Sequence, residues 1–266
     1  MTAMSAFYLP TDEPGVFIAT PSTRSVWTPD QQHGGPPSAL LTRAMEQAES
    51  SIAGPSQLVR ITVEILGPVP TGEVRASAAV TRRGRSVEML EGELVAGGRV
   101  ALRARAWRMR TEKVTLPEGY DAGLSAPPPL PGPEATMVAD AAWSSGFIDA
   151  VDFRFVRGRF DIPGPSAAWA RPRVDLVAGE PITPTQRLVA IADCGNGMSS
   201  ELHHDAWWFI NTELTIHLHR VPTGEWIYVD AHTVLDSSGV GLATTTLADL
   251  AGPVGRGAQG LMVGAR

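Results

Sequence analysis

The chain has 266 residues, of which 43% are hydrophobic and 19% charged, and its formal net charge is −6. This length and apolar content suit one large domain or two of ordinary size. The acidic balance argues against general affinity for nucleic acid or an anionic membrane. The sequence has no apolar run of about 18 residues and no basic-then-apolar N-terminal signal, so we expect a cytoplasmic protein without membrane insertion. A single cysteine, Cys194, excludes an intrachain disulfide framework and a multi-thiolate metal site.

The predicted elements of the first half are one helix and several antiparallel strands. An apolar stretch at 15–19 is expected to be an opening strand. Residues 32–48 are expected to form a loop and then a helix, because prolines suit a first helical turn and apolar residues follow at helical spacing. Strand patterns follow at 58–66, 73–81, 86–95 and 99–109, separated by turn sequences.

Residues 117–136 are rich in proline and poor in apolar residues, and we predict that they are a linker. The linker would separate an N-terminal unit, 1–116, from a C-terminal unit, 137–266. In the second unit we expect strands near 153–158 and at 167–177, and then a helix near 185–192 whose end the sequence leaves open past Gly195. Further strands are expected at 208–219, 225–235, 240–248 and 256–264.

One pentapeptide occurs twice in the chain. Val-Pro-Thr-Gly-Glu begins at Val69 and again at Val221, and each copy lies between two strand patterns. Proline fixes φ and glycine supplies a positive φ, so we predict a hairpin in both copies. The flanking elements also agree in order, which indicates tandem duplication of one unit.

The residues before the first helix are a candidate binding site. His33, Gly34 and Gly35 would place backbone N–H groups and the positive end of a helix dipole together. That arrangement suits a phosphate or a carbonyl oxygen that gains negative charge. A turn followed by a capped helix explains the same residues without any function.

The second half holds the other candidates. Asn211 and Glu213 lie on the polar face of an alternating strand, and Asp193 lies near the end of the second helix. Gln259 alternates with apolar residues, so its amide is expected to be buried and to need partners. His217 and His219 have no further ligand at a fixed spacing, so we predict no metal site.

Together these motifs resemble the acyl-CoA thioesterase II type of the double hotdog superfamily, over about residues 13–264. The resemblance rests on His-Gly-Gly-Pro-Pro-Ser-Ala-Leu-Leu, Asn-Thr-Glu-Leu-Thr-Ile-His-Leu-His-Arg, Gly-Glu-Trp and the final Gly-Arg-Gly-Ala-Gln-Gly-Leu-Met-Val. It implies an α+β fold, a double hotdog in which two fused helix-wrapped antiparallel sheets form one continuous sheet. A fused double unit already contains the pairing that single hotdog proteins achieve by dimerising, so we expect a monomer or a homodimer.

The resemblance also implies a function. The protein would hydrolyse a fatty acyl-CoA thioester to free acid and CoA by general-base activation of water, without a cofactor. The family's catalytic Asp, Thr and Gln fall on Glu213, Thr233 and Gln259; Glu is a departure, and Asn211 or Asp193 could share the role of base. A thiolate leaves without strong acid assistance, since the pKa of a thiol is about 8.5, so no Ser-His-Asp triad is needed. The expected substrate-binding residues are His33, Gly34, Gly35, Asn211 and Asp193.

Two other classes of function remain open. A non-catalytic acyl-CoA or lipid-binding hotdog protein is compatible with Glu in place of Asp. A hotdog hydratase or dehydratase needs an Asp and a His five positions apart, and no Asp in this chain has a His at that spacing.

The arginines between 82 and 110 could bind the phosphates of CoA, or could form an exposed basic face of a strand.

Overall fold

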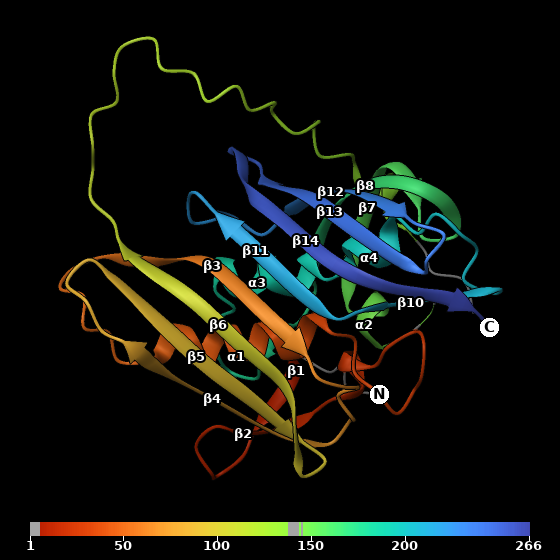
Figure 1. Cartoon of the computed structure of the whole chain (residues 1–266), viewed down its shortest axis with the longest axis horizontal. Helices are drawn as coiled ribbons and strands as arrows, with labels where there is room; N and C mark the ends of the chain where they lie inside the picture. The colour runs from red at the N-terminus through yellow and green to blue at the C-terminus, as the bar shows by residue number, and fades with distance from the viewer. Residues whose placement is uncertain (1–5, 138–143, 145) are drawn as a thin grey trace.

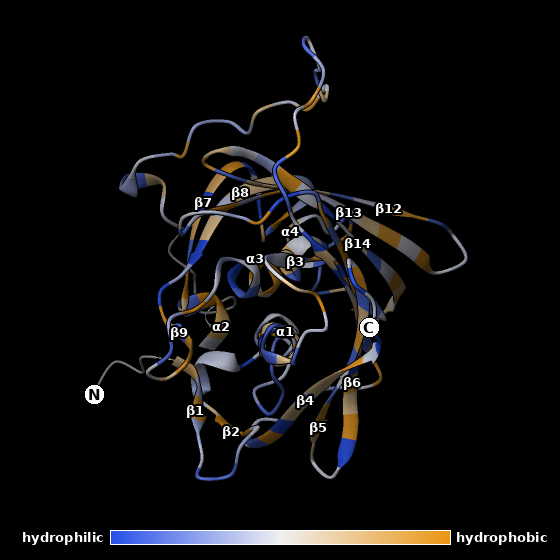
Figure 2. Ribbon diagram, turned by 90° about the vertical axis from the view of Figure 1, so that its left-hand side faces the viewer, coloured by the Kyte–Doolittle hydropathy of each residue, from blue (hydrophilic) through white to orange (hydrophobic). Residues whose placement is uncertain are grey.

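The computed structural model describes residues 6–137, 144 and 146–266. Its main feature is a 14-stranded sheet that curves around helices (Figures 1 and 2). The N-terminal elements are β1 Ala6–Pro10, β2 Val16–Ala19, η1 Pro21–Thr23, α1 Gly35–Gln47, β3 Ser56–Ile65, β4 Glu73–Arg82, β5 Val87–Ala96 and β6 Arg99–Arg110. The later elements are η2 Pro133–Ala135, α2 Gly146–Asp149, β7 Val151–Arg159, β8 Ile162–Pro172, β9 Asp175–Val177, α3 Pro184–Ala192, α4 Cys194–Met198, β10 Trp207–Asn211, β11 Glu213–Leu218, β12 Ile227–Leu235, β13 Val240–Asp249 and β14 Gly252–Ala265.

The sheet repeats one connectivity in its two halves. The strand order is β7-β8-β12-β13-β14-β11-β3-β6-β5-β4-β2-β1-β9, and β10 pairs with β14 outside this path. Outward from the antiparallel β3–β11 pair, one half runs β3, β6, β5, β4, β2 and the other runs β11, β14, β13, β12, β8. This matching order agrees with the duplication that the repeated pentapeptide indicates.

The predicted hairpins at the two pentapeptides are wrong. Gly72 and Gly224 have φ values of +106° and +70°, as a glycine turn requires. However, β3 does not pair with β4, because β6 and β5 lie between them, and β14 and β13 separate β11 from β12 in the same way. A turn sequence specifies that the chain reverses direction, but it does not specify which strands pair. Each pentapeptide therefore lies in a connection between two strands that are not neighbours in the sheet.

Most predicted elements have the expected positions, and the exceptions bear on function. The expected strand at 208–219 is two strands, β10 and β11, with a break at Thr212. Similarly, the expected strand at 167–177 is divided into β8 and β9, and β1 had no counterpart among the predicted elements. Because side chains alternate along a strand, the break at Thr212 allows Asn211 and Glu213 to face different sides of the sheet.

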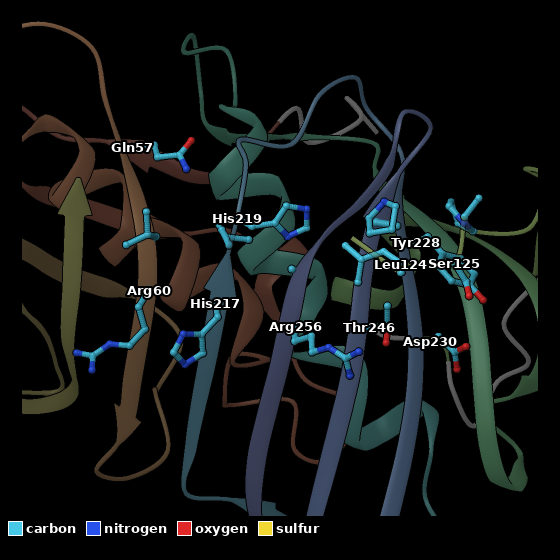
Figure 3. A pocket seen from close by; sticks show the side chains of 18 of the residues that line it. Gln57, Arg60, Leu124, Ser125, His217, His219, Tyr228, Asp230, Thr246 and Arg256 are labelled. Carbon is cyan, nitrogen blue, oxygen red and sulfur yellow. The ribbon is translucent and has the colours of Figure 1, made fainter. Parts of the chain in front are cut away.

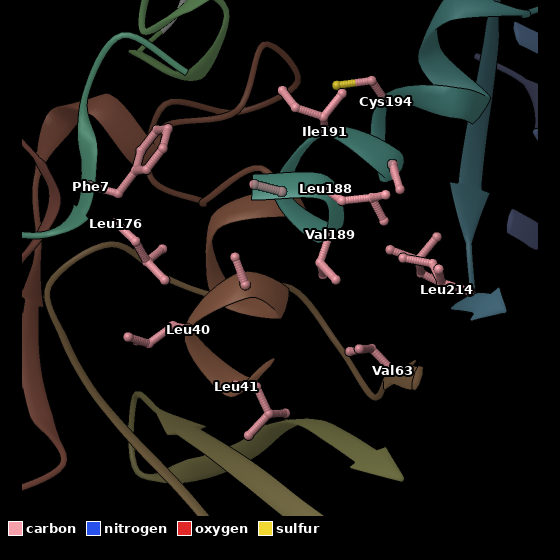
Figure 4. Close-up of a cluster of buried hydrophobic side chains, with 14 of the residues drawn as sticks. Phe7, Leu40, Leu41, Val63, Leu176, Leu188, Val189, Ile191, Cys194 and Leu214 are labelled. Carbon is pink, nitrogen blue, oxygen red and sulfur yellow. The ribbon is translucent and has the colours of Figure 1, made fainter. Parts of the chain in front are cut away.

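The core lies between the helices and the inner face of the sheet. Helices α1 and α3 lie side by side, with the N-terminus of α1 near the C-terminus of α3 (Figure 4). A Cβ on Gly35 would lie 2.2 Å from the Ala190 carbonyl oxygen, so this close approach requires glycine. The fully buried residues of the core include Leu40 and Leu41 on α1, Leu188, Val189 and Ile191 on α3, and Ile216 on β11.

The proline-rich segment crosses the outer face of the sheet, opposite the helices. Residues 111–132 form no helix or strand and arch away from β6 before they return to the C-terminal half (Figure 1). Trp169 Nε1 donates to the Pro128 carbonyl at 3.1 Å, and Arg154 donates to the Pro131 carbonyl at 2.8 Å. Leu130 also packs on a small buried cluster that includes Trp169 and Tyr228. The domain limits at 116 and 137 stay a prediction.

No helix in the described part of the chain has the length and apolar character needed to cross a membrane.

Candidate active site

Asp193 is the centre of a buried polar cluster on the inner face. It follows the last residue of α3, and its side chain is 7% exposed. The carboxylate lies beside the first residues of α1, where the positive end of the helix dipole stabilises negative charge. A Cβ on Gly34 would lie 2.8 Å from Asp193 Oδ2, so glycine is needed for this approach.

Two amides hold one oxygen of this carboxylate. Asn211 Nδ2 donates to Asp193 Oδ1 at 3.1 Å, and Gln259 Nε2 lies 3.4 Å from the same atom. Gln259 is 1% exposed, and its Oε1 accepts from the Asn196 backbone N–H at 3.0 Å. Because Oε1 faces that donor, the amide nitrogen must face Asp193. The other carboxylate oxygen, Oδ2, remains available for chemistry.

His33 lies on the Oδ2 side of the carboxylate. Its Nδ1 lies 3.2 Å from Asp193 Oδ2 and accepts from the Gly35 N–H at 3.0 Å. The ring stacks on Phe147, with centroids 3.9 Å apart and planes 11° apart. Burial lowers the pKa of His33, and the charge of Asp193 offsets this in part. Because Nδ1 accepts from the Gly35 N–H, it carries no proton in this arrangement and faces Asp193 Oδ2 as a second acceptor.

The structure therefore brings together six of the eight predicted site residues. These are His33, Gly34, Gly35, Asp193, Asn211 and Gln259.

Thr233 lies on the same face but apart from the carboxylate. It is opposite Ala243, which is opposite Gln259, so the Thr233 and Gln259 backbones are two strand spacings, roughly 10 Å, apart. Its buried hydroxyl pairs with Ser199 Oγ at 2.7 Å. The described hydrogen bonds join Thr233 to Ser199 and not to Asp193, and its catalytic role stays a prediction.

Glu213 lies on the other face of the sheet. Its Oε1 accepts from the Gly260 N–H at 2.9 Å, and its Oε2 accepts from Thr215 Oγ1 at 2.8 Å. The alternate residues of β11, Leu214 and Ile216, are the ones buried in the core. The structure does not bring Glu213 to Gln259, because the sheet separates them, and its position does not support the role of base.

Sequence reasoning missed Asn196 and Thr245. Both are buried, and Asn196 Oδ1 and Thr245 Oγ1 have no hydrogen-bond partner within the described residues. A Cβ on Gly195 in α4 would lie 2.6 Å from Thr245 Cγ2 and 3.0 Å from Gln259 Oε1, so the side chains of Thr245 and Gln259 pack against Gly195. Buried polar atoms normally have partners, so these two mark a place for water or a substrate group. The Gly-Asn-Gly sequence after the second helix was the signal that could have found Asn196, whereas Thr245 is an ordinary β-branched residue of a strand.

Several of the arginines between 82 and 110 are paired with carboxylates. Arg108 is buried, pairs with Glu88 at 2.9 Å and donates to the Ala48 carbonyl at the end of α1. It therefore anchors helix to sheet. The exposed pairs are Arg103 with Glu93 at 2.8 Å and Arg105 with Glu91 at 2.6 Å.

A curved sheet around two helices, with a polar cluster where the helices meet, defines a protein of the hotdog class. Residues 23–109 match the acyl-CoA thioesterase N-terminal domain, and residues 125–263 match the acyl-CoA thioesterase C-terminal domain. The chain belongs to this acyl-CoA thioesterase family. A comparison with curated protein sequences found no match.

Solved structures share the fold at low sequence identity. A hot dog fold protein of unknown function from Alicyclobacillus acidocaldarius has a TM-score of 0.72 and 16% identity, with 96% of each chain covered. A putative thioesterase II from Thermobifida fusca has a TM-score of 0.67 and 19% identity, with 99% of each chain covered. The acyl-CoA thioesterase II TesB2 from Mycobacterium marinum has a TM-score of 0.65 and 16% identity, with 97% of this chain and 94% of that chain covered.

Proposed function

We propose that this protein hydrolyses a fatty acyl-CoA thioester to the free acid and CoA, and that Asp193 is the general base. The observation that carries the proposal is the buried carboxylate held by Asn211 and Gln259 at the start of α1, in a chain of the acyl-CoA thioesterase family. We interpret the two halves as fused hotdog units of the α+β class. A cytoplasmic location and a monomeric or homodimeric state stay predictions.

The proposed reaction uses the two carboxylate oxygens differently. Asn211 and Gln259 engage Oδ1, so Oδ2 accepts a proton from water as the water oxygen attacks the thioester carbonyl carbon. The carbon–sulfur bond then breaks, and the proton passes from the Asp193–His33 pair to the leaving thiolate. The unpaired polar atoms of Asn196 and Thr245 supply further partners for the water or the substrate.

The start of α1 is the proposed site for the carbonyl oxygen. Pro36 and Pro37 have no N–H, so Gly34 and Gly35 supply the backbone donors of this turn. The Gly35 N–H donates to His33 Nδ1 only while Nδ1 carries no proton. When the proton from water moves toward Nδ1, Gly35 is released to donate to the developing oxyanion, and proton uptake is coupled to charge stabilisation.

A panel of acyl-CoA thioesters of increasing chain length tests the proposal, with thiol release as the measurement. We expect saturable release with at least one member of the panel. Binding to several members without thiol release would identify a non-catalytic acyl-CoA-binding protein instead. Hydration of an enoyl-CoA without thiol release would identify a hydratase.

A further inference from the structure

A row of side chains crosses the outer face of the sheet, on the side away from Asp193. Arg60, His217 and Arg256 are directly opposite one another on β3, β11 and β14. The row continues at one end to Trp107 on β6 and at the other to Thr246 and Asp230 on β13 and β12. It therefore spans the junction between the two halves of the chain.

The centre of this row concentrates positive charge in an acidic protein. No carboxylate of the described chain pairs with Arg60, His217 or Arg256, and Arg60 Nε is buried without a hydrogen-bond partner. The one carboxylate in the row, Asp230, is engaged by Arg157 at 2.6 Å. Arg60 and Arg256 lie on either side of β11, and their guanidinium groups point to opposite sides of His217 (Figure 3).

The row lies in a cavity of about 1070 Å³ between the sheet and the proline-rich segment. The segment contributes Gly123, Leu124 and the residues up to Pro128 as one wall. Trp107 and Tyr228 supply aromatic surface at the two ends of the cavity, and His219 is a further basic group. This volume corresponds to the upper end of small-molecule sites, which are roughly 300–1,000 Å³, and therefore suits a ligand of nucleotide size.

We propose that this cavity binds an organic phosphate of nucleotide size, whose phosphate groups are held by Arg60, His217 and Arg256 and whose planar or apolar part lies against Trp107 or Tyr228. Arginine side chains form short, charge-assisted hydrogen bonds to phosphate. The site is separate from the catalytic cluster, because the sheet lies between them, and it does not depend on the proposed hydrolysis.

Isothermal titration of the full chain with ADP, pyrophosphate and adenosine tests this proposal. We expect ADP to bind, pyrophosphate to bind more weakly and adenosine to show no binding. Arg60→Gln and Arg256→Gln should each weaken ADP binding by about tenfold or more, since each removes a charge-assisted pair. Arg75→Gln is the matched control: it removes an exposed arginine of β4 that pairs with Glu13 instead, and ADP affinity should not change.

A thermal melt keeps the test independent of any loss of fold. Without ligand, Arg60→Gln and Arg256→Gln should melt close to the temperature of the unaltered protein, because neither arginine pairs with a carboxylate of the described chain. ADP should raise the melting temperature of the unaltered protein more than that of either variant. Absence of ADP binding at millimolar concentration would overturn the proposal. Binding that competes with acyl-CoA but is insensitive to both substitutions would also overturn it, since it would place ADP in the catalytic site.

Discussion

Asp193→Asn is the substitution that separates the proposed mechanism from its alternatives. An asparagine Oδ1 can still accept from Asn211 and Gln259, and its Nδ2 would face His33 Nδ1, which is an acceptor. The buried hydrogen bonds are therefore retained while the base is removed. The lost charge at the start of α1 should cost only about 0.3–1 kcal/mol of stability.

The effect on the rate should be far larger than the effect on stability. Proton transfer by a positioned base contributes about 10²–10⁴-fold, which corresponds to roughly 3–5.5 kcal/mol at about 1.4 kcal/mol per tenfold. We expect kcat of Asp193→Asn to fall by that factor. KM should change little, because the proposed mechanism assigns Asp193 to the attacking water and the Asn variant keeps the hydrogen bonds from Asn211 and Gln259.

Glu213→Gln is the matched control for this experiment. It also neutralises one carboxylate, and a glutamine Oε1 can keep the hydrogen bond from the Gly260 N–H on the outer face. Steady-state thiol release from the best acyl-CoA substrate should be unchanged in this variant. Loss of activity in Glu213→Gln together with normal activity in Asp193→Asn would refute the assignment of the base.

Three further predictions concern the surroundings of the site. Gly35→Ala places a Cβ 2.2 Å from the rigid Ala190 carbonyl oxygen, so the free energy of unfolding in urea should fall by about 1–3 kcal/mol or more. The pKa of His33 is lowered, so the folded state disfavours the protonated imidazole. The contribution of neutral His33 to the free energy of unfolding is therefore complete above the pKa of the unfolded chain, about 6.5, and is lost as the pH falls below that value. Urea titrations from acid to neutral pH should show this slope, and His33→Asn should flatten it. Burial raises the pKa of the Cys194 thiol, so an aromatic disulfide reagent should label it only after denaturant is added, and rapid labelling of native protein would contradict its burial.

The sequence was sufficient for the local features of this protein. Alternation and helical spacing identified β3, β4, β5 and β6 and helices α1 and α3 within a few residues, because each pattern depends only on neighbours along the chain. The burial of Gln259 followed from the same alternation, and the positive φ values of Gly72 and Gly224 followed from turn chemistry. The order of the motifs along the chain was sufficient to identify the family.

Only the tertiary structure decided which strands pair and which carboxylate joins the amides. Strand order depends on contacts far apart in sequence, so the turn at Gly72 could not reveal that two later strands would separate β3 from β4. The break at Thr212 turns Asn211 toward Asp193 and leaves Glu213 on the outer face, because one residue of irregularity reverses the side of the sheet that a side chain faces. The facing positions of Arg60 and Arg256 around His217 likewise exist only once the two halves meet at β3 and β11.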